Sequence, residues 1–519
     1  MDYKLKRGKM KNFKDKIKQH KFGLMAIALV FIVGILCLYA KRSFHVDESL
    51  SFALSNVPGG WVTYDPQGWF ERDFFRQYAV DEHAFDYTMV YNNQYWDVHP
   101  PLYYFCLHTL SSLFPGRFSL LFGYSINFIC FVFNAIIIYY LIFSLTKKDE
   151  ISAIGVLIYG LNGKVLENLT FIRMYMLLSL FVSLFVLVSY KIITNSKEKN
   201  INYLWLFLIT ICGGLTQYQF YISIACISLL VAIDLIVNKK IKILIKSFIG
   251  VLSAILINLF VIFPYTFDQA ARGNHFAYAE NSLKIFSINI HRIFEFVLNS
   301  TFGPILLLVS VIAVIYAAYK IFAKKDKKLI IPVLYLGAYL LNFFLIAKTS
   351  SIISNRYLSS MDLVGIFSFV VLIYYILKDF NINNHIILVI MLMLLPFNFN
   401  LKILSKINTT PSWQFAEKHQ DEVAVIVNGD RNDYEINRLF VDLRWYIATG
   451  MTHIGEEFSN TIDKNFVLYI DSDVNERSSL EYIRSVISND YELEFNQENI
   501  YDGCYKMYTV EVNKKGQSN

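Results

Sequence analysis

The chain has 519 residues, of which 55% are hydrophobic and only 17% are charged. A soluble domain of this size usually carries more charge, so the composition excludes an ordinary soluble globular protein. Apolar runs long enough to cross about 30 Å of hydrocarbon recur along most of the chain. We therefore predict a polytopic α-helical membrane protein.

The hydropathy pattern predicts about eleven transmembrane spans, at about 22–40, 118–143, 151–167, 171–192, 203–216, 218–237, 245–266, 302–321, 329–347, 358–377 and 385–401. The loop between the first two spans, 41–117, is long. Within it, aromatic and charged residues alternate from Trp69 to Arg76, which favours a helix lying in the headgroup layer. A second apolar stretch, Leu102 to Phe114, is too short to span and predicts an interfacial or re-entrant helix.

The distribution of charge predicts the orientation. Residues 1–21 hold nine bases and two acids, a net charge of +7, and every second predicted loop is rich in lysine. The positive-inside rule therefore places the N-terminus in the cytoplasm. The loop 41–117 has a net charge of −4 and residues 402–519 have −8. Both are expected outside a bacterial cytoplasmic membrane, and no nucleic-acid partner is expected.

The pattern changes after residue 402. Two short apolar runs, Val423–Val427 and Phe466–Ile470, are typical of buried strands, and Ser478–Ser488 is typical of a helix. Two further strands are expected at Tyr491–Phe495 and Cys504–Val512. We therefore predict two domains, a transmembrane domain of residues 1–401 that includes the loop 41–117, and a small extracytoplasmic α/β domain of residues 402–519.

An acidic pair, Asp47-Glu48, follows the first span. Two neighbouring acids at a membrane surface repel each other, but they suit metal binding or removal of a proton from a hydroxyl. The alternative is structural, a capping acid followed by a first-turn acid of a helix. Since neighbouring residues on a helix point about 100° apart, the two side chains are expected to have different roles.

A histidine follows in the same loop, in the segment Asp97-Val98-His99-Pro100-Pro101. Two prolines make a stiff, extended approach to the next helix, which would hold His99 at the membrane surface. Either Asp97 and His99 face the same cavity as Asp47, or His99 bonds the loop backbone in a purely structural role.

Charged residues also stand at the predicted outer ends of later spans. Glu167 and Arg173, with Tyr175, flank the connection between the third and fourth spans, either as an ion pair or with Arg173 holding an anion. Arg356-Tyr357 precedes the tenth span. There a guanidinium can bind phosphate oxygens or simply extend to the interface.

These segments together resemble a known family. The motifs HVDESLSFAL, DVHPPLYYF, ENLTFIRMYMLLSLF and SNRYL, in this order, resemble the GT-C fold glycosyltransferases. More narrowly, the chain is similar to the bacterial branch related to protein O-mannosyltransferases and lipid A aminoarabinose transferases. The resemblance covers about residues 20–400.

The resemblance implies a polyprenyl-phosphate sugar as donor and inversion at the anomeric carbon in one displacement. It implies that Asp47 takes the acceptor proton, that Arg356, with Tyr357, binds the donor phosphate, and that Arg173 lines the same cavity. Glu167 and Tyr175 are further cavity candidates. Glu48, Asp97 and His99 would position the acceptor or a metal. A divalent cation, Mg or Mn, stays open, with Glu48 and His99 as candidate ligands.

The function predicted is transfer of a sugar to a cell-envelope glycan or lipid-linked acceptor on the outer face of the membrane. A transporter or flippase of lipid-linked sugars is the rival, since it also explains many spans and outer arginines. It would not need the acidic loop 41–117 or the soluble domain. A catalytically inactive assembly partner is a third alternative.

Overall fold

The computed structural model describes residues 18–41, 44–62, 68–194, 199–272, 281–282, 290–350, 354–394, 411–428, 445–450, 464–472, 474–487, 491–501 and 505–515. The chain forms two units. The first, here called the transmembrane unit, is drawn from Met1–Tyr39, Gln94–Cys106 and Leu121–Ile403. The second, here called the mixed unit, is drawn from Ala40–Asn93, Leu107–Leu120 and Leu404–Asn519.

Within the described residues, eight helices are long and apolar enough to cross a membrane, so this is a multi-pass membrane protein. They are α2 (Lys21–Ala40), α6 (Leu120–Thr146), α9 (Tyr175–Thr194), α11 (Gln219–Val237), α12 (Ile241–Ile257), α16 (Gly303–Lys324), α17 (Ile330–Thr349) and α18 (Asp362–Asp379). Each matches a predicted span, because a long apolar run must satisfy its backbone polar groups internally when no water is present.

The other three predicted spans are shorter than expected, so the count of eleven is not confirmed. The span predicted at 151–167 is broken into α7 (Asp149–Gly160) and α8 (Gly163–Leu169). The break occurs because Asn162 caps the second helix, accepting from the Lys164 backbone N–H at 2.9 Å. The last two are α10 (Asn200–Gly214), with 15 residues, and α19 (Asn384–Leu392), with nine. Residues 395–401 lie outside the described part.

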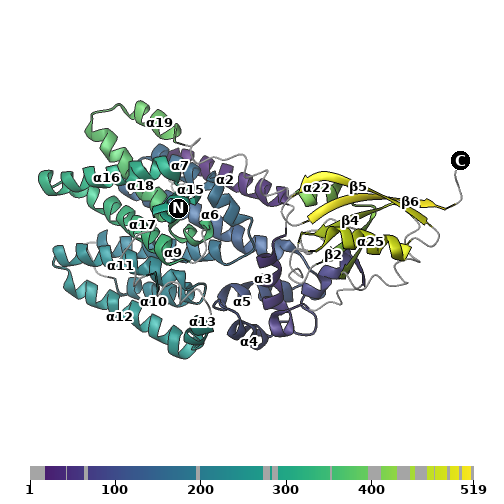
Figure 1. Cartoon of the computed structure of the whole chain (residues 1–519). Helices are drawn as coiled ribbons and strands as arrows, with labels where there is room; N and C mark the ends of the chain where they lie inside the picture. The colour runs from purple at the N-terminus through teal and green to yellow at the C-terminus, as the bar shows by residue number, and fades with distance from the viewer. Residues whose placement is uncertain are drawn as a thin grey trace, which may run out of the picture. The chain divides into compact units, whose positions relative to one another are not determined.

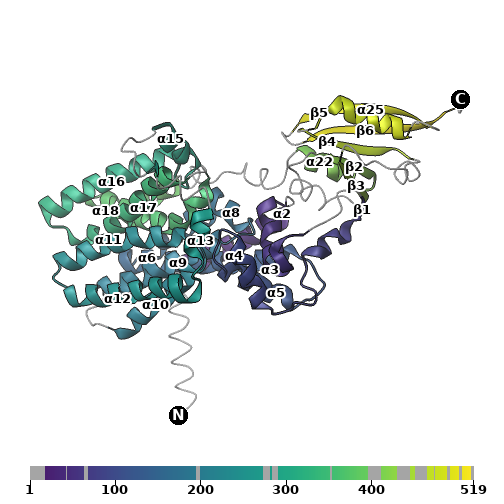
Figure 2. The same ribbon diagram turned by 60° about the horizontal axis from the view of Figure 1, so that its bottom comes forward.

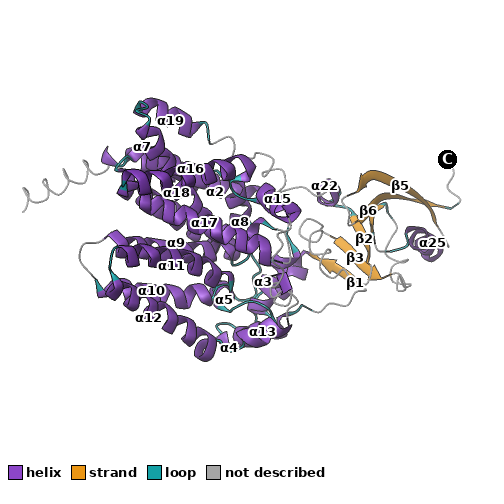
Figure 3. Cartoon of the chain, turned by 60° about the vertical axis from the view of Figure 1, so that its left-hand side comes forward, coloured by secondary structure: helices purple, strands orange, loops and turns teal. Residues whose placement is uncertain are grey.

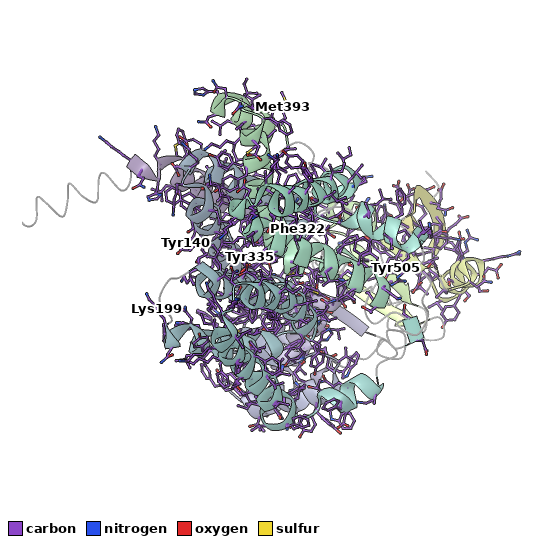
Figure 4. The ribbon with its side chains drawn as sticks, turned by 90° about the vertical axis from the view of Figure 1, so that its left-hand side faces the viewer. Tyr140, Lys199, Phe322, Tyr335, Met393 and Tyr505 are labelled. Atoms are coloured by element: carbon purple, nitrogen blue, oxygen red, sulfur yellow. The ribbon has the colours of Figure 1, made fainter. Side chains whose placement is uncertain are left out.

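The long helices lie side by side (Figures 1 and 3). α18 is the most enclosed of the spans and packs against α7, α9, α16, α17 and α19. The apolar surface that remains faces outward: Phe322 of α16 is 85% exposed, whereas Tyr335 of α17 is 1% exposed (both labelled in Figure 4). Exposed apolar side chains on such helices are expected where lipid replaces water. Two shorter helices, α13 (Thr266–Arg272) and α15 (Ile290–Asn299), belong to the same unit.

The mixed unit contains helices from the loop 41–117. They include α3 (Val46–Asn56), while α4 (Tyr87–Trp96) and α5 (Leu102–Ser112) each divide between the two units. α3 is held by Asn56, whose Nδ2 donates to the Tyr78 carbonyl at 2.9 Å and to Ser111 Oγ at 3.1 Å. The rings of Phe44, Phe52, Phe75 and Phe118 pack together beside it.

The sheet of the mixed unit has six strands in the order β1-β3-β2-β4-β6-β5. They are β1 (Gly68–Glu71), β2 (Val423–Asn428), β3 (Trp445–Gly450), β4 (Phe466–Asp471), β5 (Tyr491–Tyr501) and β6 (Tyr505–Lys514). Strands β3, β2 and β4 are parallel and the others antiparallel. The predicted α/β region is therefore confirmed. Cys504 lies outside the described residues.

The helix predicted from Trp69 to Arg76 is wrong. These residues begin as strand β1, which pairs antiparallel with β3, and continue as the 3-10 helix η2 (Arg72–Tyr78). Aromatic side chains favour a strand as readily as an interfacial helix, and β3 supplies the backbone partners. The loop after the first span thus contributes an edge strand to the C-terminal sheet.

Helices cover both faces of this sheet (Figure 2). On one face, Ile483 and Ile487 of α25 (Glu476–Ile487) form a core with alternate residues of the central strands, including Val425 and Leu468. On the other, Phe415 of α22 (Pro411–Lys418) contacts Tyr469, with ring centroids 5.5 Å apart. Because successive strand side chains point to opposite faces, the continuous apolar runs of β2 and β4 require cover on both.

Candidate active site

Asp47 lies in the first turn of α3. The N-cap of this helix is His45, whose Nδ1 accepts from the Asp47 backbone N–H at 3.0 Å and lies 3.8 Å from Asp47 Oδ2. Asp47 itself is therefore not the cap. Its side chain is 23% exposed, and the N-terminal end of the helix dipole favours a negative charge there. The arrangement leaves a fixed carboxylate within reach of solvent.

Glu48 has a structural position. It is fully buried, its Oε2 accepts from the His45 backbone N–H at 2.8 Å, and its Oε1 forms an ion pair with Lys41. Burial lowers the pKa of Lys41, and the charge of Glu48 opposes this shift. Both oxygens of Glu48 are thus engaged by protein groups at the start of α3.

Asp97 and His99 are partners. Oδ2 of Asp97 lies 2.9 Å from Nδ1 of His99, and both side chains are at most 20% exposed. Burial raises the pKa of Asp97, but the charge and hydrogen bond of His99 and the charge of Arg173 outweigh it, so the pKa lies below its ordinary value. The start of α5 is fixed next to this pair, because the Leu102 N–H donates to the Leu215 carbonyl at 2.9 Å.

Arg173 extends this group into the interior of the transmembrane unit. It is 5% exposed, and its Nη1 donates to the hydroxyl of Tyr104, which is fully buried, at 3.1 Å. Its backbone N–H donates to the Phe171 carbonyl at 2.8 Å. A buried guanidinium is costly unless it is paired, and Tyr104 and the nearby Asp97 charge provide partners on one side.

Arg356 comes from a distant part of the chain and lies beside the segment that contains Arg173. It lies in the 3-10 helix η5 (Asn355–Tyr357), and its guanidinium carbon is 5.2 Å from the ring centroid of Phe171. The ring of Tyr175 lies 6.3 Å from Phe171 and 6.2 Å from Tyr357. The structure therefore brings Arg356 to the segment 171–175, which contains the other predicted phosphate-binding arginine, Arg173.

Glu167 is the remaining charged candidate that the sequence predicted. Glu167 is 54% exposed at its side chain and forms an ion pair with Lys164 at 3.2 Å. Asp47 and Glu48 belong to the mixed unit, whereas Asp97, His99 and the two arginines belong to the transmembrane unit. The sequence motifs DVHPPLYYF and ENLTFIRMYMLLSLF contain Tyr104 and Phe171, but neither residue was predicted as part of the site. Lys41 was also missed, and no signal in the sequence distinguishes it.

The described residues do not fit a metal centre. They contain no group of three or more His, Cys, Asp or Glu side chains that would hold a metal ion. Of the two candidate ligands, Glu48 is engaged by Lys41 and His45, and Nδ1 of His99 faces Asp97. No chemical step is therefore assigned to a metal.

No protein-family model and no curated protein matches this sequence. Among solved structures, the chain is similar to ArnT from Cupriavidus metallidurans bound to undecaprenyl phosphate, at 11% identity and a TM-score of 0.48, over 94% of this chain and 97% of that one. It is also similar to the oligosaccharyltransferase AglB from Archaeoglobus fulgidus in complex with an inhibitory peptide and a dolichol-phosphate, at 8% identity and a TM-score of 0.47, over 97% and 75%.

Both TM-scores lie below 0.5 and both identities are low. The likeness is therefore weak, and the roles of individual residues depend on the contacts described above.

Proposed function

We propose that this protein is an inverting glycosyltransferase that uses a polyprenyl-phosphate sugar and acts on the outer face of a bacterial cytoplasmic membrane. The acceptor is a cell-envelope glycan or a lipid-linked glycan. One observation carries the proposal: the guanidinium of Arg356 lies over the ring of Phe171, two residues from the buried Arg173 and just before the apolar helix α9. Such a pair suits the phosphate of a lipid embedded in the membrane.

The arginines suit the departure of the phosphate. In the displacement, the acceptor oxygen bonds to the anomeric carbon while the bond from that carbon to the phosphate oxygen breaks, with both electrons going to the phosphate. Guanidinium groups neutralise the charge that develops there. A leaving phosphate stabilised in this way needs no general acid, unlike the alcohol that leaves in glycoside hydrolysis.

Asp47 is proposed as the base that takes the proton of the acceptor hydroxyl. Its side chain is partly exposed and held by the first turn of α3, as a base that meets an incoming acceptor requires. Asp97 and His99 are proposed to position the acceptor, with Asp97 kept ionised beside His99 and Arg173. Glu48 then serves to fix α3 rather than to react.

The test compares Asp47→Asn with Asp81→Asn, an exposed acid of the same loop. Each full-length variant is produced in cells that lack the chromosomal copy, and the envelope glycans are analysed by mass spectrometry. We expect Asp47→Asn to abolish the mass increment that the wild-type protein produces and Asp81→Asn to retain it. Purified Asp47→Asn should still bind undecaprenyl phosphate with wild-type affinity.

A glycan profile of wild-type composition and amount in the Asp47→Asn cells would show that Asp47 is not the base. A flippase of lipid-linked sugars predicts a different pattern, in which detergent-permeabilised membranes without the protein form the glycan normally, because the donor no longer has to cross a bilayer. Transfer that depends on the protein when donor and acceptor are supplied on the same side supports the enzyme.

A further inference from the structure

A cluster of aromatic and cationic side chains lies directly before Asp97 in the chain. Tyr95 and Trp96, at the end of α4, have ring centroids 4.7 Å apart and an interplanar angle of 73°. The guanidinium carbon of Arg272, at the end of α13, lies 5.0 Å from the centroid of Tyr95 and 5.5 Å from that of Trp96. We call these three residues the Trp96 platform. All three belong to the transmembrane unit.

The platform is held by bonds between α13 and the end of α4. Nε2 of Gln269 donates to the Gln94 carbonyl at 2.5 Å, and the hydroxyl of Tyr218 donates to Gln269 Oε1 at 2.5 Å. The Arg272 guanidinium also donates to the Tyr95 carbonyl. Tyr95 also contacts the ring of Tyr265, with centroids 4.4 Å apart. An exposed side chain with this many fixed neighbours is pre-organised for a ligand.

Trp96 is nevertheless 73% exposed. The electron-rich face of an indole attracts polarised C–H groups, and the C–H bonds of one face of a sugar ring meet it well. Arg272, itself exposed, can donate hydrogen bonds to the sugar hydroxyls. We propose that the Trp96 platform binds a sugar ring of the acceptor glycan.

This inference rests on the proposed function, since it assigns the ligand of the same reaction. The acceptor, rather than the donor, fits the platform because the donor phosphate is assigned to Arg173 and Arg356. The next polar side chain along the chain is Asp97, which is proposed to position the acceptor. An acceptor glycan that stacks on Trp96 would thus extend toward the pair Asp97 and His99.

A membrane-interface anchor is the other role of an exposed tryptophan in such a protein. The partners of Trp96 argue against an anchor. Arg272 lies over the indole ring, and the next residue, Asp97, is paired with His99. A sugar-binding residue and an anchor differ in what their removal changes: the first alters saccharide binding and the second alters stability in a bilayer.

The experiment uses the full-length protein in lipid nanodiscs and saturation-transfer NMR with separate solutions of glucose, galactose, mannose, rhamnose, N-acetylglucosamine and N-acetylmannosamine. Ribitol, a polyol without a ring, is the negative probe. We expect at least one ring sugar to receive saturation from the wild-type protein. Trp96→Ala and Arg272→Ala should weaken its binding about tenfold or more, whereas Trp96→Phe should retain most of it.

Trp61→Ala is the matched control, since Trp61 is also exposed and lies in the loop 41–117. It should leave saccharide binding unchanged. Undecaprenyl phosphate affinity, measured by native mass spectrometry, should be unchanged in Trp96→Ala and lost in Arg356→Gln. Loss of saccharide binding in Trp96→Ala with full affinity of Arg356→Gln for the lipid would support the platform and contradict the proposed function.

Three results would overturn the platform. One is wild-type saccharide binding by Trp96→Ala. Another is the absence of saturation transfer from the wild-type protein to every ring sugar. The third is a Trp96→Ala protein that binds the sugars normally but unfolds at a lower temperature in nanodiscs and not in detergent, as an anchor would.

Discussion

Nη1 of Arg173 donates a hydrogen bond of 3.1 Å to the hydroxyl of Tyr104, and both residues are almost completely buried. The bond connects the helix that follows His99 with the connection between α8 and α9. It fixes the orientation of a guanidinium that is proposed to bind phosphate, and the rigidity of such a group is part of its affinity. Tyr104 is therefore a positioning residue.

Tyr104→Phe should weaken undecaprenyl phosphate binding by about threefold to tenfold, which corresponds to the net value of one typical intramolecular hydrogen bond, about 0.65–1.4 kcal/mol. Native mass spectrometry of the purified protein measures the affinity. Tyr103→Phe, which removes the hydroxyl of the neighbouring buried tyrosine, is the control. In an Arg173→Lys background, Tyr104→Phe should have little further effect. Additive losses in the double variant would contradict the coupling.

The partnership of Asp97 with His99 predicts a pH dependence of stability. The pKa of Asp97 is lowered from 3.8, so its ionised form is favoured by folding. This stabilisation is complete above the unfolded value and is lost as the pH falls through the folded one. Asp97→Asn should therefore lower the unfolding temperature at pH 5 to 6, and the difference from the wild type should shrink below about pH 4. Thermal unfolding in detergent measures it, and a difference that stays constant down to pH 2.5 would contradict this account.

The transmembrane helices could be predicted because each depends on a local property. An apolar run such as Lys21–Ala40 must form a helix to satisfy its own backbone in lipid, whatever the rest of the chain does. The span predicted at 151–167 also depends on a local property. It is not one continuous helix, because a polar residue, Asn162, caps a new helix in the middle of the apolar stretch.

Pairings between distant segments could not be predicted. The pattern from Trp69 to Arg76 suits a helix as well as a strand, and only the backbone of β3 decides between them. The motifs did identify Arg173 and Arg356 as candidates, because cations are unexpected at the predicted outer ends of spans. The contact between Arg356 and Phe171 joins segments that are far apart in the sequence, and no local signal encodes it.

The position of Gly123 offers a test of how tightly Arg173 is held. A Cβ at Gly123 would lie 2.2 Å from Cγ2 of Ile172, the residue before Arg173. Gly123→Ala should therefore displace this segment, destabilise the protein by about 1–3 kcal/mol and weaken undecaprenyl phosphate binding. Gly337→Ala is the control, because its Cβ would meet only the end of the Leu230 side chain, at 3.1 Å. Equal lipid affinities of the two variants would show that Ile172 yields without moving Arg173.

Variants of the ion pair between Lys41 and Glu48 can distinguish a structural role of Glu48 from a chemical one. Both side chains are buried, with 5% and 0% exposed. Removing one partner of a buried pair leaves an uncompensated charge and typically costs about 3–5 kcal/mol. Glu48→Gln, which can keep the hydrogen bond from the His45 N–H, should therefore destabilise the protein through Lys41. Replacing both residues, as Lys41→Met with Glu48→Gln, should recover most of the stability, measured by thermal unfolding.

The same double variant tests the reaction. If Glu48 only fixes the first turn of α3 and so the direction of Asp47, envelope glycan formation should fall in Glu48→Gln and return in the double variant, because the buried lysine charge is gone. If Glu48 instead binds the acceptor or a metal, removing Lys41 cannot replace its carboxylate. A double variant with restored unfolding temperature and no glycan product would thus assign Glu48 a direct role beside Asp47.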